Sequence, residues 1–224
     1  MKMDSLYLPL KSTLEELSRR HSWFDLKTPK GSLGSHEILW VFKRIHAVKP
    51  TILFESGVGT GRSTLIFCEL MKPFGKVVSA NFRYEGDNPL QDFKHPENLL
   101  MVDAPGEKVA ASLPNQEKIV AVIDGPKPSG VLYGRPGWLQ LMDELVDKKR
   151  LDSVFQHDTE DKKNMEKLRG YYHSNLEGEF ILDTVTEAFL RANQFFGMEQ
   201  KERIFTPNMS AILRLRSVSI PTML

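Results

Sequence analysis

Three glycines at alternate positions follow a carboxylate in one short stretch of the chain. Glu55 precedes Gly57, Gly59 and Gly61, and an apolar run at residues 52–54 comes before it. A glycine turn lets the backbone approach a ligand closely, because no Cβ atom stands in the way. A helix that starts there offers unpaired N–H groups and a partial positive charge. The carboxylate suits a ligand with hydroxyls or an ammonium group, and the spacing differs from that of dinucleotide folds and P-loops.

A second group of polar residues follows the apolar run at residues 119–123. Asp124 comes directly after it, then Gly-Pro, which breaks the strand, and Lys127. Ligands of open α/β sheets bind outside the carboxyl ends of the strands. We therefore expect Asp124 and Lys127 on the same rim as the glycine turn, although Asp-Gly and Gly-Pro also simply initiate turns.

These residues must be positioned by strands that alternate with helices. Strands are predicted near residues 51–55, 76–81, 98–103, 119–124 and 152–157, and helices near 36–47, 64–71, 107–113, 138–149 and 160–172. The pattern predicts an α/β fold, doubly wound, with a mostly parallel central sheet and helices on both faces. Residues 1–35 are expected to form a short helical N-terminal cap, with Ser12 opening its helix in a capping box.

Composition limits the possible functions and partners. The 224 residues are enough for one domain with a sizeable core, and we expect a single domain over 1–224. A net charge of +1 is not the excess of positive charge that binding to nucleic acid or to an anionic membrane would require. The single cysteine, Cys68, fits a reducing compartment, and neither a signal peptide nor an apolar run of membrane-spanning length is seen. These features predict a cytoplasmic protein.

The stretch from residue 55 to residue 64 resembles motif I of the class I S-adenosylmethionine-dependent methyltransferases. The resemblance implies a Rossmann-like domain with the methionine end of the cofactor over the glycine turn. It implies that the cofactor is held by residues at the ends of successive strands: Glu55, Gly57, Gly59, Gly61, Asn81, Asp103, Ala104 and Asp124. Asn81 or Glu85 would contact the ribose and Asp103 with Ala104 the adenine, whereas Asn81 starting a turn and Asp103 capping a helix are the structural alternatives.

Asp124-Gly-Pro-Lys127 is similar to the Asp-x-x-Lys of catechol-type O-methyltransferases. There the aspartate binds a divalent metal and the lysine helps to deprotonate a hydroxyl. The resemblance implies a site for Mg²⁺ or another divalent cation at Asp124 and Asp158, although Thr159 replaces the Asn of that family. A metal-free enzyme with Lys127 or His157 as the base is the other possibility.

The function that these features predict is methyl transfer from S-adenosylmethionine to a hydroxyl of a small molecule. The alternatives are a binding protein without turnover on the same fold, and a nicotinamide-dependent oxidoreductase. The family usually ends in an antiparallel strand pair, for which residues 180–185 and 211–216 are the candidates. The aromatic residues within 187–209 are expected to serve the core or contacts between subunits of a homo-oligomer.

Overall fold

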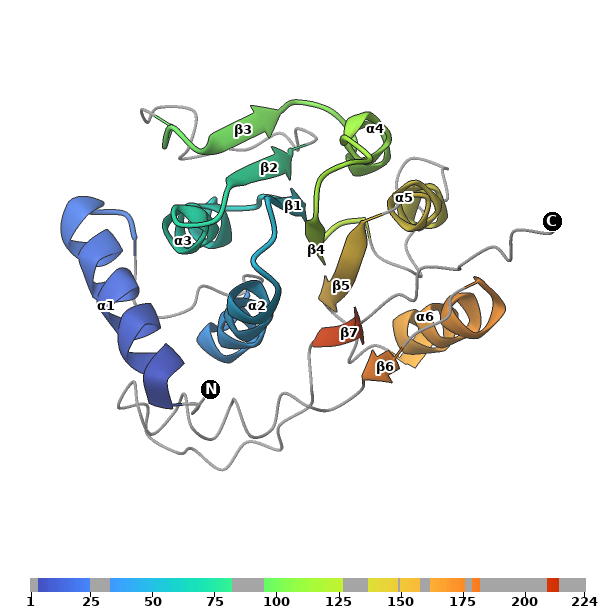
Figure 1. Ribbon diagram of the computed structural model, residues 1–224, viewed down its shortest axis with the longest axis horizontal. Helices are drawn as coiled ribbons and strands as arrows, with labels where there is room; N and C mark the ends of the chain where they lie inside the picture. The colour runs from blue at the N-terminus through green and yellow to red at the C-terminus, as the bar shows by residue number, and fades with distance from the viewer. Residues whose placement is uncertain are drawn as a thin grey trace, which may run out of the picture.

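The computed structural model of the chain describes residues 4–24, 33–81, 95–126, 137–148, 150–157, 162–175, 179–181 and 209–213. Its centre is a seven-stranded sheet, and Figure 1 shows the sheet between two groups of helices. The predicted doubly wound α/β fold is therefore confirmed. In the described ranges, every helix falls short of the length and hydrophobicity that a membrane span requires.

Five parallel strands form the main part of the sheet. They are β1 Ile52–Ser56, β2 Lys76–Ala80, β3 Leu99–Val102, β4 Ile119–Ile123 and β5 Leu151–His157. All five were predicted from the sequence to within about two residues at each end. The five residues of β4 are all buried, because a central strand of a parallel sheet is covered on both faces and must be apolar throughout.

A pair of strands that run antiparallel to each other completes the sheet. β6 Glu179–Ile181 pairs with β7 Met209–Leu213, and β7 pairs with β5, which gives the order β3-β2-β1-β4-β5-β7-β6. The expected antiparallel pair at the end of the chain is confirmed. The aromatic residues between the two strands, up to residue 208, lie outside the described residues.

The helices cover the two faces of the sheet in sequence order. They are α1 Asp4–Arg20, α2 Ser35–Val48, α3 Arg62–Met71, α4 Gly106–Ser112, α5 Gly137–Val146 and α6 Lys162–Asn175. Figure 1 shows α1, α2 and α3 on one side of the sheet and α4, α5 and α6 on the other. Each group packs its own hydrophobic cluster against the strands.

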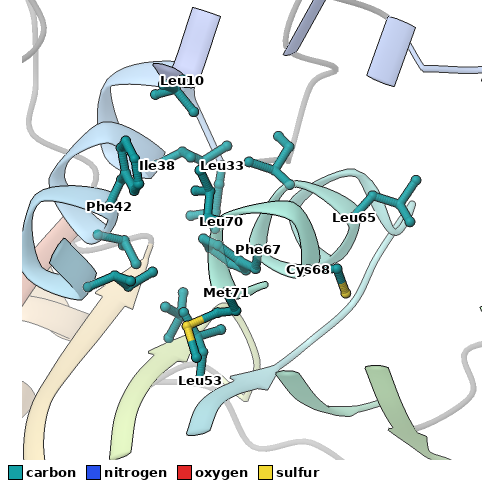
Figure 2. Packing of buried hydrophobic residues seen from close by; sticks show 14 of the residues in the cluster. Leu10, Leu33, Ile38, Phe42, Leu53, Leu65, Phe67, Cys68, Leu70 and Met71 are labelled. Atoms are coloured by element: carbon teal, nitrogen blue, oxygen red, sulfur yellow. The ribbon is translucent and has the colours of Figure 1, made fainter. Parts of the chain in front are cut away.

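Alternate residues of β1 enter the two clusters, as the two-residue period of a strand requires. Leu53 belongs to the cluster under α1, α2 and α3, whereas Ile52 and Phe54 belong to the cluster under α4, α5 and α6. Figure 2 shows Leu53 facing Phe67 and Met71 of α3. The last residues of β1 therefore emerge from a strand that is held from both sides.

The start of α1 was predicted wrongly. Ser12 was expected to open the first helix, but the helix begins at Asp4 and Ser12 lies in its interior, with Pro9 inside the helix as well. Tyr7, Leu10, Leu14 and Leu17 are all buried, at a spacing that forms one helical face. Packing of this face onto α2 and α3 outweighs the backbone hydrogen bond lost at Pro9.

Candidate active site

The loop between β1 and α3 is built on three glycines with left-handed backbone. The φ angles are +94° at Gly57, +53° at Gly59 and +79° at Gly61, and Gly61 is the N-cap residue of α3. A Cβ atom at Gly57 would lie 2.8 Å from the backbone N of Gly125, whereas one at Gly59 would meet nothing within 4 Å. Gly57 is therefore required by packing, and Gly59 faces open space.

Ser56 ties this glycine turn to the end of β4. Its carbonyl accepts hydrogen bonds from the backbone N–H groups of Asp124, at 2.8 Å, and Gly125, at 3.1 Å. Its hydroxyl donates to the carbonyl of Gly125, in the space that a Cβ of Gly106 would otherwise enter. Asp124 and the glycine turn consequently share one rim of the sheet, as predicted.

The glycine turn also lies where the order of the strands reverses. The chain runs from β1 outward through β2 to β3, then returns to place β4 on the other side of β1. Ligands of open α/β sheets bind at such a switch point, beyond the carboxyl ends of the strands. The turn, Asp124 and the end of β5 meet at this point.

Glu55 is buried beneath the turn and does not project from the rim. Its carboxylate accepts hydrogen bonds from the hydroxyls of Ser63 and Thr64, both at 2.6 Å, and of Ser79, at 2.8 Å. Burial raises the pKa of Glu55 to about 7, although the three hydroxyls oppose the shift. These contacts fix α3 against β1 and β2, and the predicted contact of Glu55 with a cofactor stays a prediction.

His157 ends β5 and contacts carboxylates on both sides of its ring. Nδ1 lies 2.7 Å from Oδ1 of Asp124, and Nε2 lies 3.5 Å from Oε1 of Glu37. Burial by itself would lower the pKa of His157, but the hydrogen bonds and charges of Asp124 and Glu37 raise it to about 10. The ring is therefore an imidazolium at neutral pH and would have to lose a proton before acting as the predicted base.

Asn81, Asp103 and Ala104 follow β2 and β3 at the same end of the sheet. The backbone N–H groups of Asn81 and Ala104 both donate to the carbonyl of Val102, at 3.0 and 2.9 Å. Asp103 is exposed, and Pro105, not Asp103, is the N-cap residue of α4. The structural alternative for Asp103, a helix cap, is therefore wrong. The ribose and adenine contacts stay predictions.

The predicted metal site cannot be assembled from the described part of the chain. Lys127, Asp158 and Glu85 lie outside the described residues. Among the residues that the structure describes, no group of three or more His, Cys, Asp or Glu side chains is arranged to hold a metal ion. Oδ1 of Asp124 already contacts the His157 ring, which is a cation competing for the same oxygen. Because Asp158 lies outside the described residues, the site for a divalent cation at Asp124 and Asp158 stays a prediction, and no chemical step is derived from it.

Sequence reasoning missed Glu37 and the hydroxyls around Glu55. Glu37 stands in the first turn of α2, where its Oε2 accepts the backbone N–H of Gly34 at 2.5 Å. That position is a recognisable helix-start signal. Nothing in the sequence indicates that the same carboxylate reaches His157, because the two residues are far apart along the chain.

Comparison with solved structures identifies the fold. A SAH-bound methyltransferase of Podospora anserina superposes with a TM-score of 0.50 at 13% identity, covering 92% of this chain and 87% of that one. A Klebsiella pneumoniae structure, assigned provisionally as an O-methyltransferase, has a TM-score of 0.49 at 13% identity, with 92% and 90% covered. A comparison with protein-family models finds no match, and neither does one with curated proteins.

The chain has the Rossmann-like fold of the class I methyltransferases. The first superposition and the parallel five-stranded part of the sheet agree on this. The fold that the resemblance at residues 55–64 implied is thereby confirmed. At 13% identity the likeness extends to the fold alone.

Proposed function

We propose that the protein is an S-adenosylmethionine-dependent methyltransferase that acts on a hydroxyl of a small molecule. The observation that carries the proposal is the turn with Gly57, Gly59 and Gly61, which lies at the switch point of a methyltransferase-like sheet. Its left-handed backbone and the open space at Gly59 allow a ligand to approach the start of α3 closely.

In this proposal, different residues of the rim bind different parts of the cofactor. The glycine turn holds the methionine end, Asn81 the ribose, and Asp103 with Ala104 the adenine. S-adenosylmethionine, when bound, would supply its sulfonium methyl group: the acceptor oxygen would bond to the methyl carbon, the carbon–sulfur bond would break to leave S-adenosylhomocysteine, and the acceptor's proton would pass to a base. The chain contributes by holding the acceptor in line and by keeping water away from it.

Asp124 is the group proposed to meet the acceptor hydroxyl. It is partly exposed at the rim, with 21% of its side chain accessible, while its His157 partner is buried. A carboxylate held in this way accepts a hydrogen bond from a hydroxyl and orients its oxygen. Lys127, three residues further along the chain, is proposed as the group that assists removal of the proton.

The two alternative functions differ in what supports them. The sheet order β3-β2-β1-β4-β5-β7-β6, with antiparallel β7, differs from the 3-2-1-4-5-6 order of dinucleotide folds and disfavours the nicotinamide-dependent oxidoreductase. A binding protein without turnover would share every feature of the turn. Only a turnover measurement separates it from an enzyme.

That measurement is transfer of a labelled methyl group from S-adenosylmethionine to a panel of phenols, catechols and sugars. We expect at least one acceptor to be methylated by the wild-type chain. We expect Asp124→Asn and Lys127→Ala to lower kcat by about tenfold or more, since each removes a group that positions or deprotonates the acceptor. Asp152→Asn is the matched control, because Asp152 pairs with Arg44 near the amino end of β5.

Metal dependence is tested in the same assay with Mg²⁺ and with a chelator. Full activity in chelator supports the metal-free enzyme. Activity that requires Mg²⁺, and loses this requirement in Asp158→Ala, supports the catechol-type alternative. Cofactor binding without methylation of any acceptor would support the binding protein.

A further inference from the structure

A buried carboxylate outside the glycine turn contacts the rim indirectly. Glu37 is 1% exposed and comes from α2, an element that carries none of the predicted site residues. Its two oxygens have separate contacts: Oε2 accepts the N–H of Gly34, and Oε1 faces Nε2 of His157 at 3.5 Å. A charge buried to this extent is costly without a partner of opposite sign. The His157 ring supplies that partner.

The His157 ring transmits this contact to the rim. Its other nitrogen lies 2.7 Å from Oδ1 of Asp124, so opposite edges of one rigid ring are held by two carboxylates. Gln156, the preceding residue, donates to the carbonyls of Ile123 and His157, at 3.2 and 3.0 Å, and so fixes the backbone on which the ring is mounted. The ring cannot turn without breaking a contact at one edge or the other.

We propose that Glu37 is a positioning residue of the active site: it fixes the His157 ring, which in turn orients the Asp124 carboxylate at the rim. The inference rests on the proposed function, in which Asp124 meets the acceptor. The arrangement is comparable to the outer carboxylates that orient metal-binding or catalytic histidines, with the difference that the histidine here orients a second carboxylate.

Capping of α2 is the competing explanation for Glu37, and an isosteric change separates the two. Glu37→Gln keeps a carbonyl oxygen for the Gly34 N–H, so the helix start is retained. It replaces the negative oxygen that faces Nε2 by an amide and removes the charge that holds the ring. Glu37→Asp restores the charge on a shorter side chain. Glu69→Gln is the matched control, since Glu69 is a helical glutamate paired with Arg20 and Lys72 away from the rim.

The first test is NMR of the full chain labelled with ¹⁵N-histidine. It detects the ring N–H groups directly and needs no substrate that accepts a methyl group. The chain has six histidines, and the His157 signals are assigned by their loss in His157→Gln. At pH 7.5 we expect two slowly exchanging ring N–H signals from His157 in the wild type and in Glu69→Gln. Glu37→Gln should lose the Nε2–H signal and shift the Nδ1–H signal, and Glu37→Asp should recover part of the pattern.

Unchanged His157 signals in folded Glu37→Gln would overturn the inference, because the carboxylate would then serve only the helix cap. A single ring N–H in the wild type would overturn it as well, and this result does not depend on any variant folding. Failure of the proposed function is a separate outcome: the wild type would bind no S-adenosylhomocysteine and methylate nothing, while the NMR signals still decide the role of Glu37.

The second test is turnover with S-adenosylmethionine and whichever panel compound the wild type methylates. A positioning residue should lower kcat by about tenfold in Glu37→Gln while the KM for the cofactor stays within about twofold, and Glu37→Asp should regain part of the rate. Loss of cofactor binding and rate together, with no recovery in Glu37→Asp, would show a merely structural residue.

Discussion

Glu55 shows how an acidic side chain is accommodated beneath the glycine turn. It is 1% exposed, and three hydroxyls from α3 and β2 donate hydrogen bonds to its two oxygens. The hydroxyls favour the ionised form, burial opposes it, and burial dominates, which leaves the pKa of Glu55 at about 7. Ionisation of Glu55 therefore lowers the free energy of unfolding, at a position close to the candidate site.

Replacing this carboxyl should stabilise the protein at high pH. The folded pKa of about 7 lies above the ordinary value of 4.5, so the folded state holds the proton more tightly than the unfolded state. Stability is therefore lost as the pH rises from 4.5 to 7 and stays reduced above that. We expect Glu55→Gln to raise the free energy of unfolding, relative to wild type, by up to about 3 kcal/mol more at pH 8 than at pH 5. Urea unfolding at both pH values measures this, and an equal difference at the two would contradict it.

His157 should show a pH dependence in a higher range. Its folded pKa of about 10 lies above the ordinary 6.5, so its contribution is complete below pH 6.5 and is lost as the pH rises through 10. His157→Gln leaves Asp124 and Glu37 without their cation and should cost roughly 3 kcal/mol at pH 6.5. The cost should shrink at pH 9.5. Unfolding at the two pH values checks this, and a cost that grows with pH would refute the charged ring.

The turn between α3 and β2 leaves no room for a side chain at Gly75. A Cβ atom at Gly75 would lie 2.1 Å from the carbonyl oxygen of Thr51, which also accepts the N–H of Lys76 at 3.1 Å. Both partners are backbone, so neither can yield without moving the start of β1. The segment holds β2 in register beside β1 and thereby positions the carboxyl ends of the two strands relative to each other.

Gly75→Ala should therefore destabilise the fold, whereas Gly170→Ala should not. Gly170 lies within α6, and a Cβ there meets nothing within 4 Å. We expect Gly75→Ala to cost about 2–4 kcal/mol and Gly170→Ala to gain up to about 1 kcal/mol from helix propensity. In thermal unfolding this corresponds to a fall of about 4–16 °C for the first variant. Equal melting points would show that the turn relaxes freely.

The same elements show what the sequence could predict. Buried strands such as β4 were placed because a run of five apolar residues between turn signals has few other interpretations. The start of α1 was misplaced because a local capping signal at Ser12 was weighed above the apolar face that begins at Tyr7. The contact from Glu37 to His157 was not predictable, because it depends on how α2 packs beside β5 and not on any local pattern.

In the molecule as a whole, the sheet brings residues that are far apart in the sequence to one place. The glycine turn after β1, Asp124 after β4 and His157 at the end of β5 converge because parallel strands end on the same side. The reversal of strand order between β1 and β4 lies at the place where they meet. We propose that this place binds the methyl donor. Gly59 is the residue best suited to test it, since a Cβ atom there meets nothing within 4 Å.

The decisive measurement is a melting curve with and without S-adenosylhomocysteine, for the wild type and for Gly59→Leu, which the unliganded fold should tolerate at a modest strain cost. With the ligand at about a hundred times its dissociation constant, the wild type should gain roughly 2.7 kcal/mol, or about 5–11 °C. Gly59→Leu should gain nothing, because its side chain occupies the approach to the backbone. A wild-type melting point that a saturating concentration leaves unmoved would contradict the methyltransferase assignment.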